Sequence, residues 1–242
     1  MFTYPIGGPT GPVVPASLKT GLVSWWTLDE PSAGSAQVDR ADSHGSNTAV
    51  DSFTTVPSST EAKQGLSLGA GPTDYIRIAT PHGMDPGASS FSASVWVRAA
   101  AYAGDMTPFG VAANGGSLSW WFQYINATDR LSMQVLSSGF KIATDTNIGS
   151  PSINTWYHLY GEFDTDANTI GISINYGAMD TTAVTGTIYA SGGPAAIGYL
   201  NGVGRYWNGQ IDEAAYWSRI LTTDERTSVF QDGDGITYTD IP

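Results

Sequence analysis

The sequence predicts an all-β protein built as a two-sheet antiparallel sandwich. Its 242 residues include 29 glycines and 13 prolines, only 13% are charged, and tryptophan and tyrosine are frequent. This is a turn-rich composition with aromatic residues that favour strands. Short runs of alternating apolar and polar residues recur along the chain. With 41% hydrophobic residues the chain can bury one sizeable core, so we expect a single main domain over residues 21–232.

The first 20 residues predict an extended arm. Proline and glycine recur there without a helix or strand period, which excludes a helix or an inner strand. We expect the arm to lie against a neighbouring chain, although a mobile terminus is the alternative. The anchoring residues would be Tyr4, Pro5, Pro9, Pro12 and Pro15. Residues 233–242 are expected to form a separate C-terminal tail.

Four segments are expected to form strands of the sandwich. Residues 130–135 and 169–175 alternate cleanly, which predicts half-buried antiparallel strands. Residues 91–98 and 156–163 carry aromatic side chains on both faces. A strand that is apolar on both faces lies between two layers or under a loop.

A fifth strand is predicted over residues 210–217. The pair Asn208-Gly209 is a strong hairpin signal directly before it. Strict alternation would place Asp212 on one face with Ala214 and Tyr216, and Glu213 on the opposite face. The two adjacent carboxylates would therefore diverge.

One short helix is predicted near the C-terminus. Thr222 and Glu225 have the spacing of a capping box, in which each side chain bonds the other residue's backbone amide. Val229 and Phe230 are expected to dock this helix on the sandwich.

Charge and cysteine content exclude several classes of function. The formal charge of −12 argues against a nucleic-acid partner. No apolar run reaches the roughly 18 residues that a membrane helix requires. The first residues lack the pattern of an export signal, so we expect synthesis in a host cytoplasm. The absence of cysteine excludes disulfides, thiol catalysis and thiolate metal sites.

Several blocks occur in an order that is typical of one family. They are residues 22–30 with 41–47, 91–97, 156–164 with 174–177, and 205–221. Together they resemble laminin G-like jelly-roll domains of the concanavalin A-like lectin/glucanase superfamily. The resemblance implies a jelly-roll sandwich that is often a lectin-like or adhesive module without enzymatic activity. Fold alone does not decide function, which depends on the residues of each candidate site.

The family resemblance implies a structural Ca²⁺ between the first and last strands. Oxygen ligands at similar positions here would come from Asp212, Asp42 and Asn47. The alternative is that the carboxylate of Asp212 is bonded to loop amides.

Aromatic residues suggest a glycan site, with core or subunit packing as the alternative. The candidates are Trp207, Tyr206, Trp120 and Trp121, because exposed rings stack on sugars. Catalysis on glycans would need two carboxylates in one cleft. The acidic strand pattern of the family's glucanases does not occur in this sequence, so we expect no enzymatic activity.

Residues 232–238 resemble the ending of phage-encoded laminin G-like proteins. This likeness, with the predicted arm, favours a structural protein of a phage virion that decorates the capsid or belongs to the tail. Its partners would be other virion subunits, and it would form a homo-oligomer. A lectin-like module for host-surface glycans is the first alternative, and a glycan-active enzyme is the second.

Overall fold

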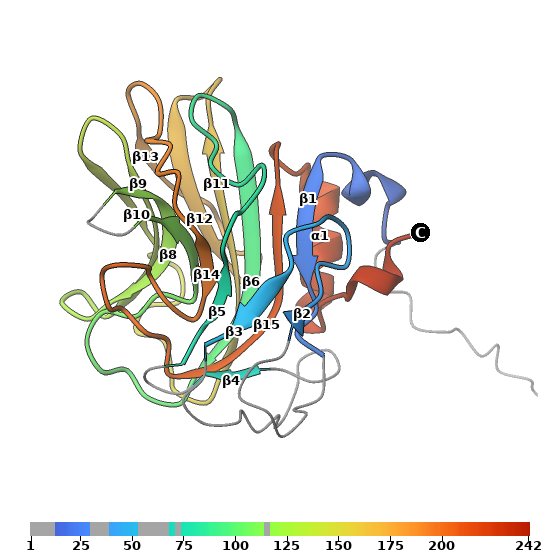
Figure 1. The fold of residues 1–242 in the computed structure, drawn as a ribbon, viewed down its shortest axis with the longest axis horizontal. Coiled ribbons are helices and arrows are strands. Elements are labelled where there is room, and N and C mark those ends of the chain that lie inside the picture. Colours follow the sequence, from blue (N-terminus) through green and yellow to red (C-terminus); the bar gives the residue numbers. More distant parts are fainter. Residues whose placement is uncertain (1–12, 30–38, 53–67, 71–73, 114–116) are drawn as a thin grey trace, which may run out of the picture.

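The computed structural model describes residues 13–29, 39–52, 68–70, 74–113 and 117–242. They form a sandwich of two antiparallel sheets, as predicted (Figure 1). The first sheet has seven strands in the order β1-β15-β6-β11-β12-β13, with β4 also paired to β15. Its strands are β1 (Leu22–Trp26), β4 (Leu68–Ala70), β6 (Phe91–Ala99), β11 (Trp156–Asp164), β12 (Thr169–Ile174), β13 (Asp180–Ala183) and β15 (Gly209–Trp217).

The second sheet has eight strands in the order β10-β9-β8-β7-β14-β5-β3-β2. Its strands are β2 (Asp39–Arg40), β3 (Ala49–Asp51), β5 (Ile76–Ile78), β7 (Phe109–Ala112), β8 (Leu118–Ile125), β9 (Arg130–Leu136), β10 (Phe140–Thr144) and β14 (Ala195–Ile197). Strands β8, β9 and β10 lie at the edge farthest from the C-terminus (Figure 1).

The main core fills the space between the sheets. Alternation in β9 sends Leu131, Met133 and Val135 into this core, while Trp120 enters it from β8. Strands β6 and β11 are inner strands of their sheet, and β6 is buried almost along its whole length. The alternate side chains of β8, β9 and β10 point away from this core, onto the outer face of the second sheet.

A β-bulge in β15 makes the predicted alternation wrong at Ile211, whereas residues 214–217 alternate between the two faces as predicted. The pairing with β6 shifts between Asp212 and Ala215, and Glu213 has a positive φ of 46°. The extra residue moves Ile211 onto the core face with Ala214, whereas Ala215 lies in a separate cluster on the other side. Sequence periodicity cannot reveal a bulge, because one inserted residue reverses the face of everything on one side of it.

The pair Asn208-Gly209 does not close a hairpin. The preceding strand β14 lies in the second sheet and β15 lies in the first, so the pair marks the crossing between sheets. Gly209 has a φ of 151°, and a Cβ there would lie 2.1 Å from the Arg98 carbonyl oxygen. Glycine is therefore required by close backbone contact at the start of β15.

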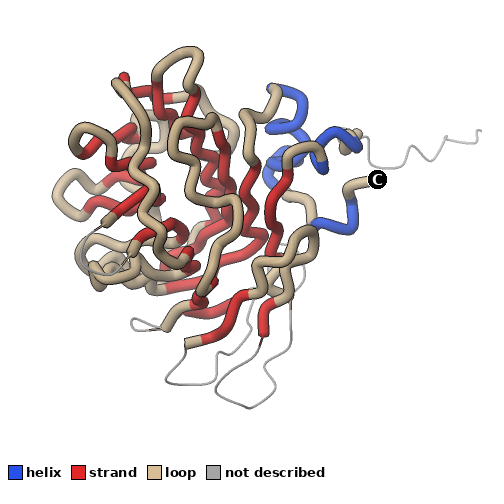
Figure 2. Tube along the Cα trace, turned by 45° about the horizontal axis from the view of Figure 1, so that its top comes forward, coloured by secondary structure: helices blue, strands red, loops and turns tan. Residues whose placement is uncertain are grey.

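A helical layer covers the outer face of the first sheet (Figure 2). It contains the 3-10 turns η1 (Ala16–Lys19), η2 (Gln231–Gly233) and η3 (Tyr238–Asp240), and the helix α1 (Thr223–Phe230). The predicted capping box of Thr222 and Glu225 is present. Leu18 and Ile241 are buried in the same cluster, so both ends of the described chain pack on this face. Residues 16–19, within the segment expected to be extended, therefore form a helical turn.

Among the described residues, no helix is both long and apolar enough to cross a membrane.

Candidate binding groove

A groove lies on the outer face of the second sheet, where β8, β9 and β10 are adjacent. Its volume is about 360 Å³. The floor comes from these three strands, and one wall comes from the loop before β15. The lining residues are Asp105, Leu118, Trp121, Gln123, Ile125, Gln134, Phe140, Ile142, Val203 and Arg205.

Strand register arranges the floor in rows across the sheet. Trp121 on β8 lies opposite Gln134 on β9, and Gln134 lies opposite Ile142 on β10. In the next row Gln123 lies opposite Ser132. Side chains on one face of a sheet come from every second residue of each strand. The pairing of the strands therefore fixes the positions of these groups relative to one another.

Two donors fix the amide of Gln123. Its Oε1 accepts hydrogen bonds from Trp121 Nε1 at 2.8 Å and from Arg205 Nη1. The Nε2 atom has no hydrogen-bond partner among the described residues. Because the amide cannot turn without losing both bonds, Nε2 remains an oriented donor for a ligand.

The neighbouring Gln134 has the opposite role. Its Nε2 donates to Ser132 Oγ at 3.1 Å, which leaves Oε1 as an acceptor without a partner among the described residues. The groove floor therefore contains both a hydrogen-bond donor, Gln123 Nε2, and an acceptor, Gln134 Oε1.

Apolar side chains form the rim of the groove. Phe140 is 62% exposed and packs edge-on against Trp121, with ring centroids 6.1 Å apart. Ile142 and Val203 are also exposed. A large aromatic ring that stays exposed beside oriented polar groups is a typical feature of a ligand site.

An ion pair closes one end of the groove. Arg205 Nη2 lies 3.4 Å from Asp105 Oδ2. Asp105 Oδ1 also accepts a hydrogen bond from the Asn126 amide at 3.0 Å, which holds the carboxylate in place.

Three of the four predicted glycan-binding aromatics are buried. Trp120 and Trp207 belong to the main core and have no exposed surface. Trp121 is 1% exposed, so it forms the floor of the groove and offers no open ring face. The burial of these three rings agrees with the alternative interpretation, in which they pack in the protein rather than bind a glycan.

The fourth predicted aromatic, Tyr206, lies half-buried in a stack of tyrosines. Its ring centroid is 4.5 Å from that of Tyr199, which in turn lies 4.6 Å from Tyr75. Burial and the neighbouring Tyr199 raise the pKa of the Tyr206 hydroxyl. Tyr206 directly follows Arg205, so this stack lies beside the groove without lining it.

Sequence reasoning missed Gln123, Gln134 and Phe140. In the sequence, Gln134 is one of the polar residues that alternate with apolar ones over residues 130–135. Its significance depends on the register with β8 and β10, which brings residues from three strands into one row. The polar outer face of residues 130–135 was the available signal for a surface site.

The residues proposed for Ca²⁺ have protein partners. Both oxygens of Asp42 accept backbone amides, with Oδ1 bonded to Trp25, His44 and Gly45 and Oδ2 bonded to Asn47. The Asn47 side-chain oxygen accepts the His82 amide at 2.8 Å. Asp42 Oδ1 already accepts three backbone amides, whereas Asp42 Oδ2 and Asn47 Oδ1 each accept one.

Asp212, the third proposed ligand, is fully buried, and its Oδ1 accepts the Glu213 amide at 3.1 Å. Within the described ranges, no three His, Asp or Glu side chains lie together as a metal site. Calcium binding by these residues stays a prediction.

Most of the predicted anchoring residues, namely Tyr4, Pro5, Pro9 and Pro12, lie outside the described residues. Pro15 is described and precedes η1 as its N-cap residue. Within η1, Leu18 is buried, and its carbonyl oxygen accepts a hydrogen bond from Trp217 Nε1 at 2.8 Å. The chain is therefore tied to the sandwich from this point.

Solved structures share this fold at low sequence identity. One is domain 4 of AbnA, a GH43 extracellular arabinanase from Geobacillus stearothermophilus, in complex with arabinotriose. It has a TM-score of 0.62 and 16% identity, covering 85% of this chain and 96% of that one. Another is the binding domain of Paraclostridial Mosquitocidal Protein 1, with a TM-score of 0.66 and 13% identity over 88% of this chain and 53% of that one.

A third is the ligand binding domain of Botulinum neurotoxin serotype D in complex with N-acetylneuraminic acid. It has a TM-score of 0.64 and 12% identity, covering 90% of this chain and 52% of that one. This chain thus spans about half the length of the two toxin chains. At these identities the likeness shows the fold alone.

No curated protein sequence matches the chain. The sequence profile named Laminin_G_3, described as the concanavalin A-like lectin/glucanases superfamily, matches residues 69–225. That match covers more than half of the chain and contains all the strands that form the groove floor. It agrees with the two-sheet sandwich and with the resemblance found in the sequence. The chain belongs to the concanavalin A-like lectin/glucanase superfamily.

Proposed function

We propose that this protein is a carbohydrate-binding module and that the groove over β8, β9 and β10 is its binding site. One observation carries the proposal. An oriented amide donor on Gln123 and an amide acceptor on Gln134 lie beside the exposed ring of Phe140. All three belong to adjacent strands of one sheet.

The chemistry of these groups matches that of a sugar ring. A sugar presents hydroxyl groups, each of which can donate and accept hydrogen bonds, and it also presents an apolar face of C–H groups. Planar amides suit the hydroxyls, and an aromatic ring suits the apolar face. Because the strands hold these side chains in place, little conformational entropy is lost when a ligand binds.

We propose that the groove binds sugars without cleaving them. Glycoside hydrolysis commonly uses two carboxyl groups that flank the scissile bond. Among the described lining residues, Asp105 is the one acidic side chain, and it is paired with Arg205. A second carboxylate is therefore not in place to act as nucleophile or base.

The fold neighbours support the proposal. Two of them were solved with a sugar bound, arabinotriose in one and N-acetylneuraminic acid in the other. A sandwich of this fold can therefore serve as a sugar-binding scaffold. The choice of groove and residues for this chain rests on its own side chains.

A matched pair of variants tests the groove. Phe140→Ala removes a ring that is 62% exposed and lines the groove, whereas Tyr189→Ala removes a ring that is 61% exposed and does not. A glycan array should first identify a ligand for the wild-type protein. Titration calorimetry should then show binding weakened about tenfold or more by Phe140→Ala and unchanged by Tyr189→Ala. Equal effects of both variants, or no ligand on the array, would refute the proposal.

A role in a phage virion is a second, independent proposal. It rests on the predicted N-terminal arm and on the likeness of residues 232–238 to the ending of phage-encoded laminin G-like proteins. Residues 16–19 are tied to the helical layer through Leu18, and Val13 beyond them is 90% exposed. Val13, the first described residue, accepts a hydrogen bond from the Ser228 hydroxyl of α1 and so lies at the helical layer, on the face opposite the groove. Deletion of residues 1–12 should abolish incorporation into particles while leaving the melting temperature unchanged, and unchanged incorporation would refute this role.

A further inference from the structure

The charged groups of the groove balance each other. Arg205 is the one cation and Asp105 the one anion among the described residues that line it. Their side chains are 29% and 33% exposed, so both reach the groove surface. The groove is therefore polar but carries no net charge, although the whole chain carries −12.

The guanidinium of Arg205 is already occupied on two sides. Its Nη1 donates to Gln123 Oε1 and its Nη2 faces Asp105 Oδ2. A free guanidinium binds a carboxylate through two parallel hydrogen bonds, which makes it the usual receptor for an anionic sugar. In this protein the carboxylate of Asp105 occupies the position beside Arg205 that the carboxylate of an anionic sugar would take.

An anionic ligand would also meet repulsion. It would have to displace Asp105 or bind beside it, and two like charges at close range oppose each other. The acidic balance of the whole protein adds a long-range repulsion. A neutral sugar meets neither penalty.

The groups that remain available are uncharged. They are the amides of Gln123 and Gln134, which belong to the groove floor and are 2% and 4% exposed, and the apolar rim around Phe140. Such a set recognises hydroxyls and an apolar ring face, and none of its members needs a charge on the ligand.

We propose that the groove selects neutral glycans over acidic ones, and that Asp105 sets this selectivity by pairing with Arg205. The inference rests on the proposed sugar-binding function and names the ligand class of the same site. Asp105 acts here through Arg205, as a specificity-determining residue. Its effect is to exclude carboxylate-bearing sugars such as uronic and sialic acids.

The test compares two ligand classes on three proteins. Neutral oligosaccharides and matched oligosaccharides with one uronic or sialic acid residue are titrated into the wild-type protein, Asp105→Asn and the double variant Asp105→Asn/Arg205→Met. An asparagine at position 105 can still accept the Asn126 amide, so the loop is expected to keep its place. The readout is the ratio of the affinities for acidic and neutral ligands at low and high salt.

The wild-type protein should bind neutral ligands at least about tenfold more tightly than acidic ones. Asp105→Asn should raise the acidic-to-neutral ratio by about tenfold at low salt, since Arg205 is released to bind a carboxylate. High salt should remove most of that gain, and the double variant should remove all of it. A wild-type preference for acidic ligands, or a ratio unchanged by Asp105→Asn, would overturn the inference while leaving sugar binding intact. Binding of neither class would instead refute the proposed function and this inference with it.

Discussion

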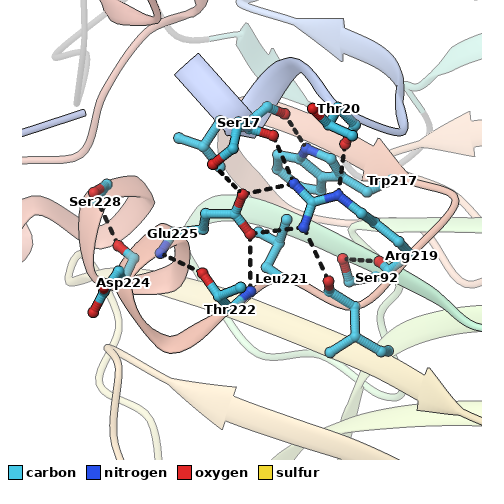
Figure 3. A network of polar contacts seen from close by, with 12 residues as sticks. Ser17, Thr20, Ser92, Trp217, Arg219, Leu221, Thr222, Asp224, Glu225 and Ser228 are labelled. Carbon is cyan, nitrogen blue, oxygen red and sulfur yellow. Dashed lines mark hydrogen bonds and ion pairs between the residues drawn. The ribbon is translucent and has the colours of Figure 1, made fainter. Parts of the chain in front are cut away.

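Arg219 and Glu225 form a two-point ion pair that fastens the helical layer to the sandwich (Figure 3). Arg219 Nη1 donates to Glu225 Oε2 and Nη2 donates to Oε1, each at 2.7 Å. The same carboxylate accepts the Ser17 hydroxyl at 2.7 Å and the Thr222 amide at 2.9 Å. One side chain thus joins the N-terminal turn, the start of α1 and the segment after β15.

Neutralising this carboxylate should destabilise the protein. Glu225→Gln removes the charge from four hydrogen bonds and leaves the Arg219 guanidinium with a weaker partner. We expect the free energy of unfolding to fall by about 2 kcal/mol at pH 7. Denaturant unfolding measures this loss. Asp224→Asn, at an exposed neighbouring position, is the matched control and should change stability by less than about 0.5 kcal/mol.

The same network predicts loss of stability in acid. Burial alone would raise the pKa of Glu225, but the hydrogen bonds from Arg219, Ser17 and Thr222 lower it from 4.5 to about 2. A pKa that is lower in the folded state stabilises the fold above pH 4.5, and the stabilisation disappears between pH 4.5 and 2. Unfolding of Glu225→Gln should therefore depend less on pH in this interval. An equal dependence in both proteins would contradict the assignment.

Glu213 should have the opposite pH dependence. Burial raises the pKa of its carboxyl to about 9, partly opposed by the hydrogen bond from Trp25 Nε1, and Oε1 has no partner among the described residues. The folded protein therefore keeps Glu213 protonated at pH 7, whereas the unfolded chain ionises it near 4.5. Stability should fall as the pH rises from about 4.5 to 9.

The test is Glu213→Gln, which keeps an acceptor for Trp25 and cannot ionise. We expect it to gain about 2 kcal/mol relative to the wild-type protein between pH 5 and pH 8. Asp166→Asn removes an exposed carboxylate and should show no such gain. A constant difference between Glu213→Gln and wild type at all pH values would refute the raised pKa.

The fold could be predicted from sequence because its signals are local. Alternation over residues 130–135 and the capping box at Thr222 both depend on neighbouring residues, and both are confirmed in β9 and α1. The bulge at Glu213 could not be predicted, because nothing in its sequence separates an extended residue from one with positive φ. The error falls on Ile211, which lies on the core face with Ala214 and Tyr216, whereas Ala215 and Trp217 lie on the opposite face as predicted.

The groove could be predicted much less well because it depends on contacts between distant segments. Gln123, Gln134 and Arg205 come from two strands and a loop up to 82 residues apart. Their chemistry arises from register and from the Trp121 indole that orients Gln123. Tryptophan was singled out as a sugar platform, yet in this sheet Trp121 serves as the floor that orients the polar group.

Gly110 should be intolerant of any side chain. A Cβ there would lie 2.4 Å from Trp121 Cβ and 2.9 Å from the Trp120 carbonyl oxygen, so the backbones of β7 and β8 would have to separate. Gly161→Ala is the matched comparison, because its Cβ would meet the movable ends of Phe122 and Met133 at 2.6 and 2.9 Å. We expect Gly110→Ala to cost about 3 kcal/mol and Gly161→Ala about half of that. Thermal unfolding measures both, and an equal or reversed order would contradict the close contact in the groove floor.

Asp42 should stabilise the fold through backbone amides and independently of calcium. Its carboxylate accepts four N–H groups from the end of β1 and the loop that follows β2. Asp42→Ala leaves these donors without an acceptor, and we expect a loss of about 3 kcal/mol. Asp42→Asn keeps one oxygen acceptor and should lose about half as much. If accepting these amides is the only role of Asp42, the loss of stability in Asp42→Ala should be the same in chelator and in millimolar Ca²⁺. A loss that appears only in Ca²⁺ would instead show that the carboxylate binds the ion, because removing a ligand has no effect once the metal is already absent.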